Sequence, residues 1–247
     1  MQQHGWPSRR SGLTYLLGFG LALATAEIVL IAGHVVLGMT LHAALLLVAT
    51  AQFALAREPA RESIIAALLP LTRLVSLAVP TGEIDHSLAY ALVSGPLLIA
   101  ALLVAREVAP RMLATELGRP RTPWTQVRLA GLGLPMGLLL LQAAEGAPAG
   151  PAAAQFSLIA VVLVTALFEE VLFRGLLQHV VAARSPLLSL LLPNALYATM
   201  YLGSGSPAVV AAMASIGLIL SICVLRTGSL WGVSAAHAIA RLIAGFA

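Results

Sequence analysis

Continuous apolar windows, each about as long as a bilayer-crossing helix, recur along nearly the whole chain. Hydrophobic residues make up 60% of its 247 residues and charged residues only 10%, whereas a soluble domain carries roughly 25% charged residues. So little charge cannot solvate a soluble surface, and inside lipid only helices or closed barrels satisfy the backbone. Barrel strands alternate polar and apolar residues, and these windows do not. The sequence therefore predicts an all-α fold, a polytopic transmembrane helix bundle.

Eight windows approach the roughly 20 residues that a helix needs to cross a bilayer, and a ninth is less regular. The eight cover about 13–36, 39–56, 88–105, 127–143, 154–180, 186–203, 207–225 and 229–246. The ninth, 63–80, contains Pro70 and Arg73, so it is either a further span or an interfacial segment. Counting it as a span, we expect about eight or nine spans.

The first window has two interpretations. Its basic start, apolar middle and small-residue end are typical of a signal peptide, but the apolar run resumes after Glu27, which favours an uncleaved span. Glu27 shares a helical face with His34 and is either a core partner or a site residue. His34 and His42 lie near expected span ends, where interfacial histidines are ordinary.

The basic residues predict how the chain is oriented. All 14 are arginines, and they stand at the ends of apolar runs rather than in a cluster on a soluble face, which argues against nucleic-acid binding. If Arg9 and Arg10 are cytoplasmic and 63–80 is a span, every arginine-bearing connection falls on the same side, as the positive-inside rule requires. These connections carry Arg57 and Arg61, Arg106 to Arg128, Arg184, and Arg226. With no lysine and much alanine, the sequence suggests a GC-rich bacterial genome, so we expect an integral protein of the bacterial inner membrane with a cytoplasmic N-terminus.

Ionisable residues inside the apolar windows are the main indication of function, because each costs at least about 2.5–3.5 kcal/mol near the bilayer centre. Glu170, Arg174 and Gln178 are spaced i, i+4, i+8 and share one helical face. Glu169 lies about 100° around the helix from Glu170. One carboxylate can then be neutralised by arginine while the other stays free to act as a base. The alternative is a purely structural ion pair, with Glu169 bonded to a neighbouring helix.

Two later windows add polar residues at helical spacing. Asn194, Tyr197 and Tyr201 follow i, i+3, i+7, and His237 and Arg241 follow i, i+4. Each set can therefore present its polar groups to the same neighbour. Arg241 could instead extend to the far membrane interface.

Three short blocks follow one another in the C-terminal half. They read EEVLFRG at 169–175, RTGSLW at 226–231 and AAH at 235–237. Over roughly residues 155–246, this pattern resembles the CAAX prenyl endoprotease and Abi (CPBP) family of intramembrane glutamate proteases.

The resemblance implies roles for individual residues. Glu169 corresponds to the catalytic glutamate that activates a water, and Glu170 and Arg174 to its supporting pair. His237 corresponds to a histidine that stabilises the oxyanion together with the residue four positions on, which is Arg241 here.

The chain also departs from the family pattern at two of these positions. The second family motif, Phe-x-x-x-His, aligns with YATMY, which places Tyr197 at the aromatic position and Tyr201 at the histidine. The third motif ends in Asn or Asp, and Arg241 stands there. Tyrosine, with a pKa near 10, cannot replace imidazole as a base at neutral pH, but it can orient a water. Arginine can donate to an oxyanion with a fixed charge and a different reach.

These observations lead to one expected function and two alternatives. We expect 1–150 to supply N-terminal spans of uncertain role and 151–247 a CPBP-like catalytic core, within one membrane domain. The expected activity is hydrolysis of a peptide bond in a membrane-embedded or lipid-linked protein, with Asn194 and Tyr197 lining the cavity. A catalytically inactive scaffold or chaperone is the first alternative, and an ion-coupled transporter the second. No cofactor is expected: without a His-Glu-x-x-His pair, a divalent metal held by His237 and the glutamates is the less favoured possibility.

Overall fold

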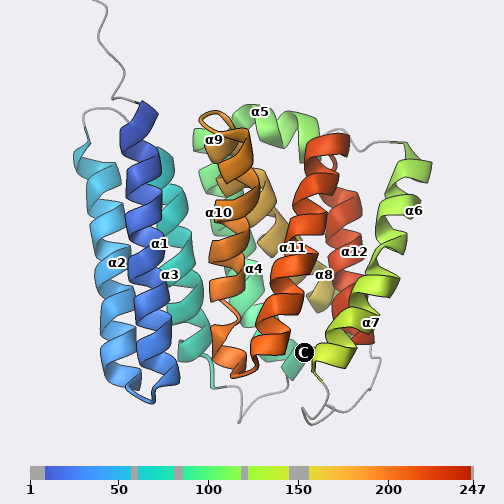
Figure 1. Ribbon diagram of the computed structural model, residues 1–247, viewed down its shortest axis with the longest axis horizontal. Helices are drawn as coiled ribbons and strands as arrows, with labels where there is room; N and C mark the ends of the chain where they lie inside the picture. Colours follow the sequence, from blue (N-terminus) through green and yellow to red (C-terminus); the bar gives the residue numbers. More distant parts are fainter. Residues whose placement is uncertain (1–8, 57–60, 81–85, 118–121, 145–155, 246–247) are drawn as a thin grey trace, which may run out of the picture.

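The computed structural model describes residues 9–56, 61–80, 86–117, 122–144 and 156–245, and nearly all of them are helical. Figure 1 shows long helices that stand side by side and alternate in direction along the chain. The all-α, polytopic fold class predicted from composition is confirmed. Predicted features that fall in the gaps between these ranges, such as Arg57, lie outside the described residues.

The N-terminal half begins with four long helices: α1 (Arg9–Ile31), α2 (Val35–Leu55), α3 (Arg61–Ala78) and α4 (His86–Val108). Helix α1 ends earlier than the expected window 13–36, because the chain turns at Gly33 with φ +88°. Few residues other than glycine adopt that backbone conformation. His34 therefore lies exposed in the turn, whereas Glu27 is fully buried in α1.

Helix α3 resolves the uncertainty about residues 63–80. It continues through Pro70 without interruption and runs alongside α1 and α2, as Figure 1 shows. It is therefore a member of the bundle and not a segment lying across its end.

The remaining helices form the other half of the bundle. They are α5 (Pro110–Met112), η1 (Leu113–Leu117), α6 (Pro123–Gly131), α7 (Gly133–Ala143), α8 (Phe156–Glu170), η2 (Val171–Leu177), α9 (Gln178–Ala182), α10 (Pro186–Thr199), η3 (Leu202–Ser204), α11 (Pro207–Thr227) and α12 (Leu230–Ile243). Helices α8, η2 and α9 follow one another without a break, so the expected window 154–180 is, from Phe156 on, one helix with an irregular centre.

The starts of α10, α11 and α12 follow directly from their sequences. Ser185, Ser206 and Ser229 each cap the helix that follows by accepting a hydrogen bond from the backbone N–H three residues further along. The first two are followed by proline at the first helical position, which needs no N–H partner there. These caps fix where the three helices that carry the C-terminal polar residues begin.

Six helices in the described part of the chain are long and apolar enough to cross a membrane. They are Gly12–Ile31, Val35–Leu55, Leu88–Val108, Pro123–Ala143, Pro186–Ser204 and Pro207–Thr227. Helix α3 and the α8–α9 helix run among them but carry charged residues, and α12 has 14 residues. Buried charge occurs in both groups, since Glu27 is buried in α1 and Glu170 and Arg174 are buried in the α8–α9 helix.

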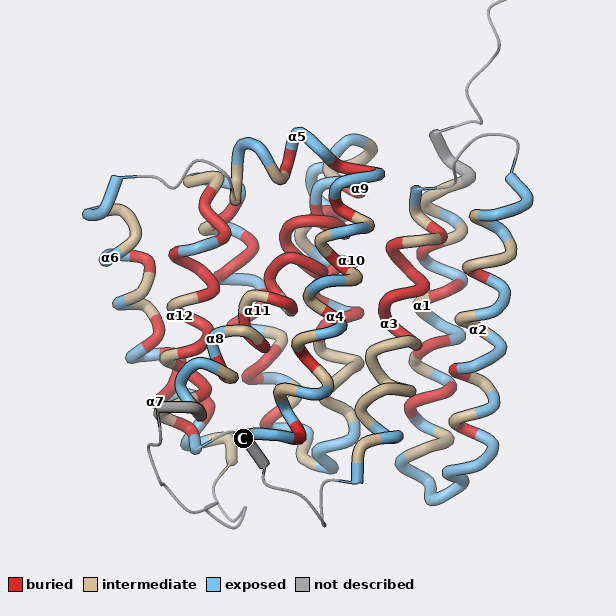
Figure 2. The backbone as a smooth tube through the Cα atoms, turned by 180° about the vertical axis from the view of Figure 1, so that it is seen from behind, coloured by how far each residue is buried: buried red, intermediate tan, exposed pale blue. Residues whose placement is uncertain are grey.

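Buried residues concentrate where the helices face one another, as Figure 2 shows, while α2 at one edge is largely exposed. Large apolar side chains such as Leu21, Val36 and Leu103 are exposed on outward faces. In water such a surface would associate with other apolar surfaces, so it fits a protein surrounded by lipid.

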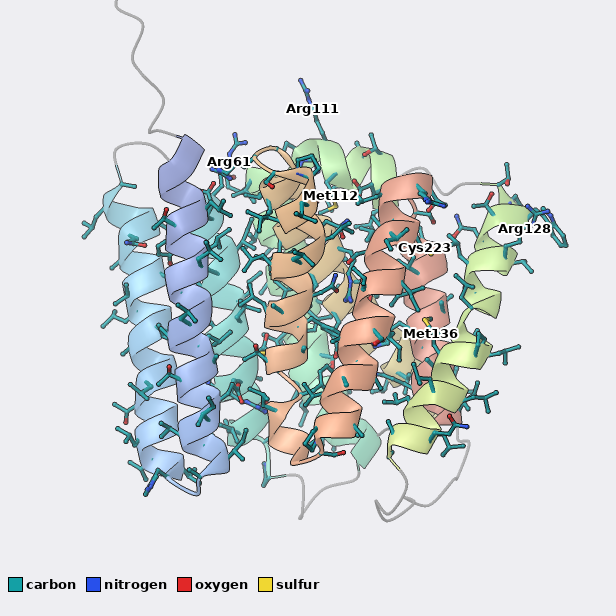
Figure 3. All side chains as sticks on the ribbon, in the orientation of Figure 1. Arg61, Arg111, Met112, Arg128, Met136 and Cys223 are labelled. Carbon is teal, nitrogen blue, oxygen red and sulfur yellow. The ribbon has the colours of Figure 1, made fainter. Side chains whose placement is uncertain are left out.

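The two halves of the chain share this core. Helix α3 contacts η2, α4 packs against α8, and α1 touches α10. Figure 3 places Arg61, Arg111 and Arg128 toward the same end of the bundle, which is the arrangement that the arginine pattern predicts.

Candidate active site

The site is built around an irregular turn in the α8–α9 helix. Residues Val171–Leu177 form a π-helical segment, in which the backbone N–H of Gln178 donates to the carbonyl of Phe173, five residues back. Such widened turns are rare and frequently occur at functional sites. This one directly follows Glu169 and Glu170, at the centre of the bundle.

Glu170 is sealed inside the protein and paired with arginine. Arg174 Nη1 donates to Glu170 Oε1 at 3.1 Å, and both side chains are fully buried. This is the i, i+4 pair that the spacing predicts. Removing either charge would leave the other without compensation in a low-dielectric interior.

A second layer of contacts holds Arg174 from the other side. Its Nη2 donates to Asn194 Oδ1 at 3.3 Å, and its guanidinium lies 4.4 Å from the centre of the Tyr197 ring. Asn194 Nδ2 in turn donates to Ser221 Oγ at 3.1 Å. Gly217 makes room for this layer, because a Cβ there would lie 2.6 Å from Arg174 Nη2 and from Asn194 Oδ1.

His237 connects the two glutamates. Its Nδ1 lies 2.8 Å from Glu170 Oε1, and its Nε2 lies 3.1 Å from the Tyr197 hydroxyl and 3.6 Å from Glu169 Oε2. If the Nδ1–H donates to the carboxylate of Glu170, Nε2 is left to accept from Tyr197. These two partners therefore favour the tautomer in which a neutral His237 carries its proton on Nδ1.

Glu169 differs from its neighbour in both partners and access. Its Oε1 accepts from Arg241 Nη2 at 2.8 Å, and its Oε2 accepts from the Tyr201 hydroxyl at 3.0 Å. Arg241 also donates to the Tyr201 hydroxyl. The side chain of Glu169 is 14% exposed, whereas that of Glu170 is 0% exposed. Glu169 is thus the more accessible of the two acids.

The structure brings all the predicted site residues into one connected cluster. They are Glu169, Glu170, Arg174, Asn194, Tyr197, Tyr201, His237 and Arg241. Arg241 faces this cluster rather than extending to the far end of its helix. With two carboxylates and two guanidinium groups, the cluster carries no net charge while His237 is neutral.

Two contributors to the cluster were not predicted from the sequence. Ser221 and Gly217 lie in an apolar run of α11, where small residues are common and give no specific signal. Gln178 was predicted on the same stripe as Arg174, and it reaches the backbone carbonyl of Ser221 at 3.1 Å. The polar contacts of this helical face therefore extend to α11.

The chemistry available in the cluster is proton transfer and charge stabilisation. Each carboxylate oxygen has two lone pairs, so Glu169 can still accept a hydrogen bond at both oxygens while held by Tyr201 and Arg241. Within the described residues, no group of three or more His, Cys, Asp and Glu side chains is placed to hold a metal ion. The expectation that the site works without a metal stays a prediction.

Comparison with known proteins agrees with the motifs. A family model described as type II CAAX prenyl endopeptidase, Rce1-like, matches residues 151–243. No curated protein and no solved structure matches the chain. The matched segment contains helices α8 to α12 and every residue of the cluster. Residues 151–243 therefore match the model of the Rce1-like type II CAAX prenyl endopeptidases, which confirms the resemblance predicted from the motifs.

Proposed function

We propose that the protein is an intramembrane endopeptidase in which the carboxylate of Glu169 activates a water molecule. The family of its C-terminal segment is a protease family. The observation that carries the proposal is the contrast between adjacent acids: Glu170 is sealed by Arg174 and His237, whereas Glu169 keeps some exposure and faces His237 across 3.6 Å. A structural ion pair needs only one of these carboxylates.

The reaction begins when Glu169 accepts a proton from a water whose oxygen attacks the carbonyl carbon of the scissile peptide bond. A C–O bond forms and the carbonyl oxygen becomes an oxyanion. When this intermediate collapses, the C–N bond breaks and the proton held by Glu169 passes to the departing amine. The products are a new carboxyl terminus and a new amino terminus.

The departures from the family pattern give Tyr201 and Arg241 a part in this reaction. Both are hydrogen-bond donors that already meet at Glu169. A substrate carbonyl placed beside Glu169 lies within their reach, so both can donate to the oxyanion as its charge develops. Arg241 also brings a fixed positive charge, which asparagine would not.

A non-catalytic scaffold is the second candidate, and one observation favours it. Both oxygens of Glu169 already accept hydrogen bonds, and Tyr201, where the family has histidine, supplies one of them. A protein that only binds a partner has no need to release Glu169 from these contacts. This candidate predicts that binding survives when Glu169 loses its charge.

The proposed substrate is a membrane-embedded or lipid-linked protein, since the cluster lies among helices long and apolar enough to cross a bilayer. We further propose that the arginine-bearing end faces the cytoplasm of a bacterial cell, following the positive-inside rule. The expected location is the inner membrane.

Mass spectrometry of new protein termini tests the proposal. Membranes from cells that produce the wild-type protein, Glu169→Gln or Glu107→Gln are compared, Glu107 being an exposed acid that serves as the matched control. Hydrolysis predicts products with the wild type and Glu107→Gln that disappear with Glu169→Gln. Identical termini in all three membranes would reject it. If Tyr201→His combined with Arg241→Asn then also yields no products, the scaffold is favoured.

A further inference from the structure

A second buried polar cluster lies in the N-terminal half, outside the segment matched by the family. Arg73 on α3 donates from Nε to Glu27 Oε1 on α1 at 2.7 Å, and from Nη2 to Glu27 Oε2. His42 on α2 places its Nε2 3.4 Å from Glu27 Oε1. Glu27 and His42 are fully buried. No step of the proposed hydrolysis uses these residues.

A hollow of about 410 Å³ opens beside this ion pair, between α1, α3 and the η3 turn. Its lining consists of Glu27, Leu30, Ile31, Arg73, Leu77 and residues 203–205. Glu27 lies four residues before the end of α1 and Arg73 five residues before the end of α3. At 1.5 Å per residue, the charged floor is roughly 6–8 Å inside the helix ends. If these ends reach the bilayer surface, the floor lies where the headgroups, roughly 5–8 Å thick on each side, meet the hydrocarbon.

Arg73 keeps hydrogen-bond donors available to this hollow. Its Nε and Nη2 bind Glu27, and Nη2 also reaches the carbonyl of Met200 at 3.5 Å. Its Nη1 donates to no acceptor in the described part of the chain. Gly203 leaves this edge uncovered, because a Cβ there would lie 3.1 Å from Nη2 and 3.7 Å from Nη1.

The charge and the walls of the hollow together define the ligand. Glu27 neutralises Arg73, so the floor carries no net charge and attracts a free anion only weakly. The walls, however, are apolar, and Ile31 and Leu77 are partly exposed at the mouth. A ligand that combines an acceptor-rich head with an apolar chain satisfies both parts.

We propose that this hollow binds a membrane phospholipid, with a phosphate oxygen accepting from Arg73 Nη1 and an acyl chain lying along Ile31 and Leu77. The phosphate diester supplies acceptors for the donors that Glu27 leaves unused. Because the neutral floor attracts a phosphate only weakly, the acyl chain supplies the rest of the affinity through apolar contact with the walls. This site is separate from the hydrolytic cluster and does not depend on it.

Native mass spectrometry of the full-length protein in a neutral sugar detergent tests the site. Dioleoyl-phosphatidylglycerol is titrated against the wild type, Leu77→Glu, Ser204→Trp and Val36→Glu. Leu77→Glu places a negative charge at the mouth, and Ser204→Trp fills the hollow from an exposed position. Val36→Glu is the matched control, since it adds the same charge at the same end of the bundle but outside the hollow.

The proposal predicts that the Kd of the tightest lipid-binding step rises at least about tenfold in Leu77→Glu and Ser204→Trp, and less than about twofold in Val36→Glu. Thermal unfolding of each variant confirms that it is folded. Equal affinity in all four proteins would overturn the proposal. Glycerol phosphate serves as the probe for the head alone: binding as tight as that of the whole lipid would overturn the lipid assignment in favour of a free phosphate ester.

Discussion

The two buried polar clusters of this protein both contain carboxylate, arginine and histidine side chains but differ in the number and the accessibility of their carboxylates. In the N-terminal cluster, one carboxylate, Glu27, meets one arginine, Arg73, beside one histidine. In the C-terminal cluster, two adjacent carboxylates meet two arginines and one histidine, and one carboxylate stays partly open. The first arrangement holds one fully buried carboxylate, whereas the second adds a carboxylate, Glu169, whose side chain is 14% exposed.

This difference suggests how to distinguish a hydrolytic site from a buried ion pair that takes no part in hydrolysis. Burial alone does not separate them, because Glu27 and Glu170 are equally inaccessible. The distinguishing features are the second carboxylate and its access. Substitutions in either cluster test this comparison, and the largest loss of stability is expected at the sealed acid, Glu170.

The first prediction concerns the sealed acid. Glu170→Gln leaves Arg174 buried without its counter-charge, which costs about 3–5 kcal/mol of unfolding free energy. Glu169→Gln removes charged hydrogen bonds from a more accessible group and should cost roughly 1–3 kcal/mol. Thermal or denaturant unfolding in detergent measures both. Equal losses of unfolding free energy would show that Glu170 and Glu169 do not differ in how strongly the fold depends on their charge.

The second prediction concerns the space behind the arginine. Gly217→Ala places a methyl group against Arg174 and Asn194, and such overpacking costs about 1–3 kcal/mol. Gly95→Ala, in α4, is the control because nothing lies within 4 Å of its added carbon. There the change should be neutral or stabilising by up to about 1 kcal/mol. If Gly217→Ala is as stable as this control, the described packing around Arg174 is wrong.

The third prediction concerns the N-terminal pair as a unit. Replacing Glu27 and Arg73 together by Gln and Met removes both charges, and neutral replacements of buried pairs are often tolerated. We expect unfolding free energy within about 1 kcal/mol of the wild type and unchanged peptidase activity. Activity assays alongside unfolding measurements check this. A complete loss of activity in a stable double variant would place the N-terminal cluster in the catalytic machinery.

The fourth prediction lies outside both clusters, at Glu116 in η1. Burial raises the pKa of its carboxyl group to about 7, and its Oε2 is buried without a partner in the described part of the chain. Because the folded state holds this proton more tightly than the unfolded state, the stabilisation is complete below about pH 4.5 and is lost as pH rises through 7.

Thermal unfolding between pH 4 and 8 measures this dependence. Glu116→Gln cannot ionise, so its stability should fall less than that of the wild type across the same interval. Parallel curves for the two proteins would contradict the assigned role of Glu116. Neither polar cluster should respond to this substitution.

Helical spacing predicted the local part of the fold and of the site. It placed Glu170 and Arg174 on the same face of one helix. It also placed Tyr197 and Tyr201 on one face of a second helix, and His237 and Arg241 on one face of a third. That these faces converge came from the family resemblance, since spacing within one helix says nothing about which helices meet.

What the sequence did not reveal depends on tertiary contacts. Arg73 looked like a reason to doubt a span, yet it is neutralised by Glu27 from a helix 46 residues earlier. His42 looked interfacial but is fully buried beside the same acid. The π-helical turn after Glu170 was also not predicted, since helical spacing assumes a regular helix.

The most direct test of the central claim is the cleavage rate of one identified substrate by purified protein in liposomes, compared between the wild type and Glu169→Gln. If Glu169 is the base, the rate falls by about 10²–10⁴-fold while the variant remains folded and still binds the substrate. A folded Glu169→Gln variant that cleaves within about twofold of the wild-type rate would show that this carboxylate does not perform the chemistry.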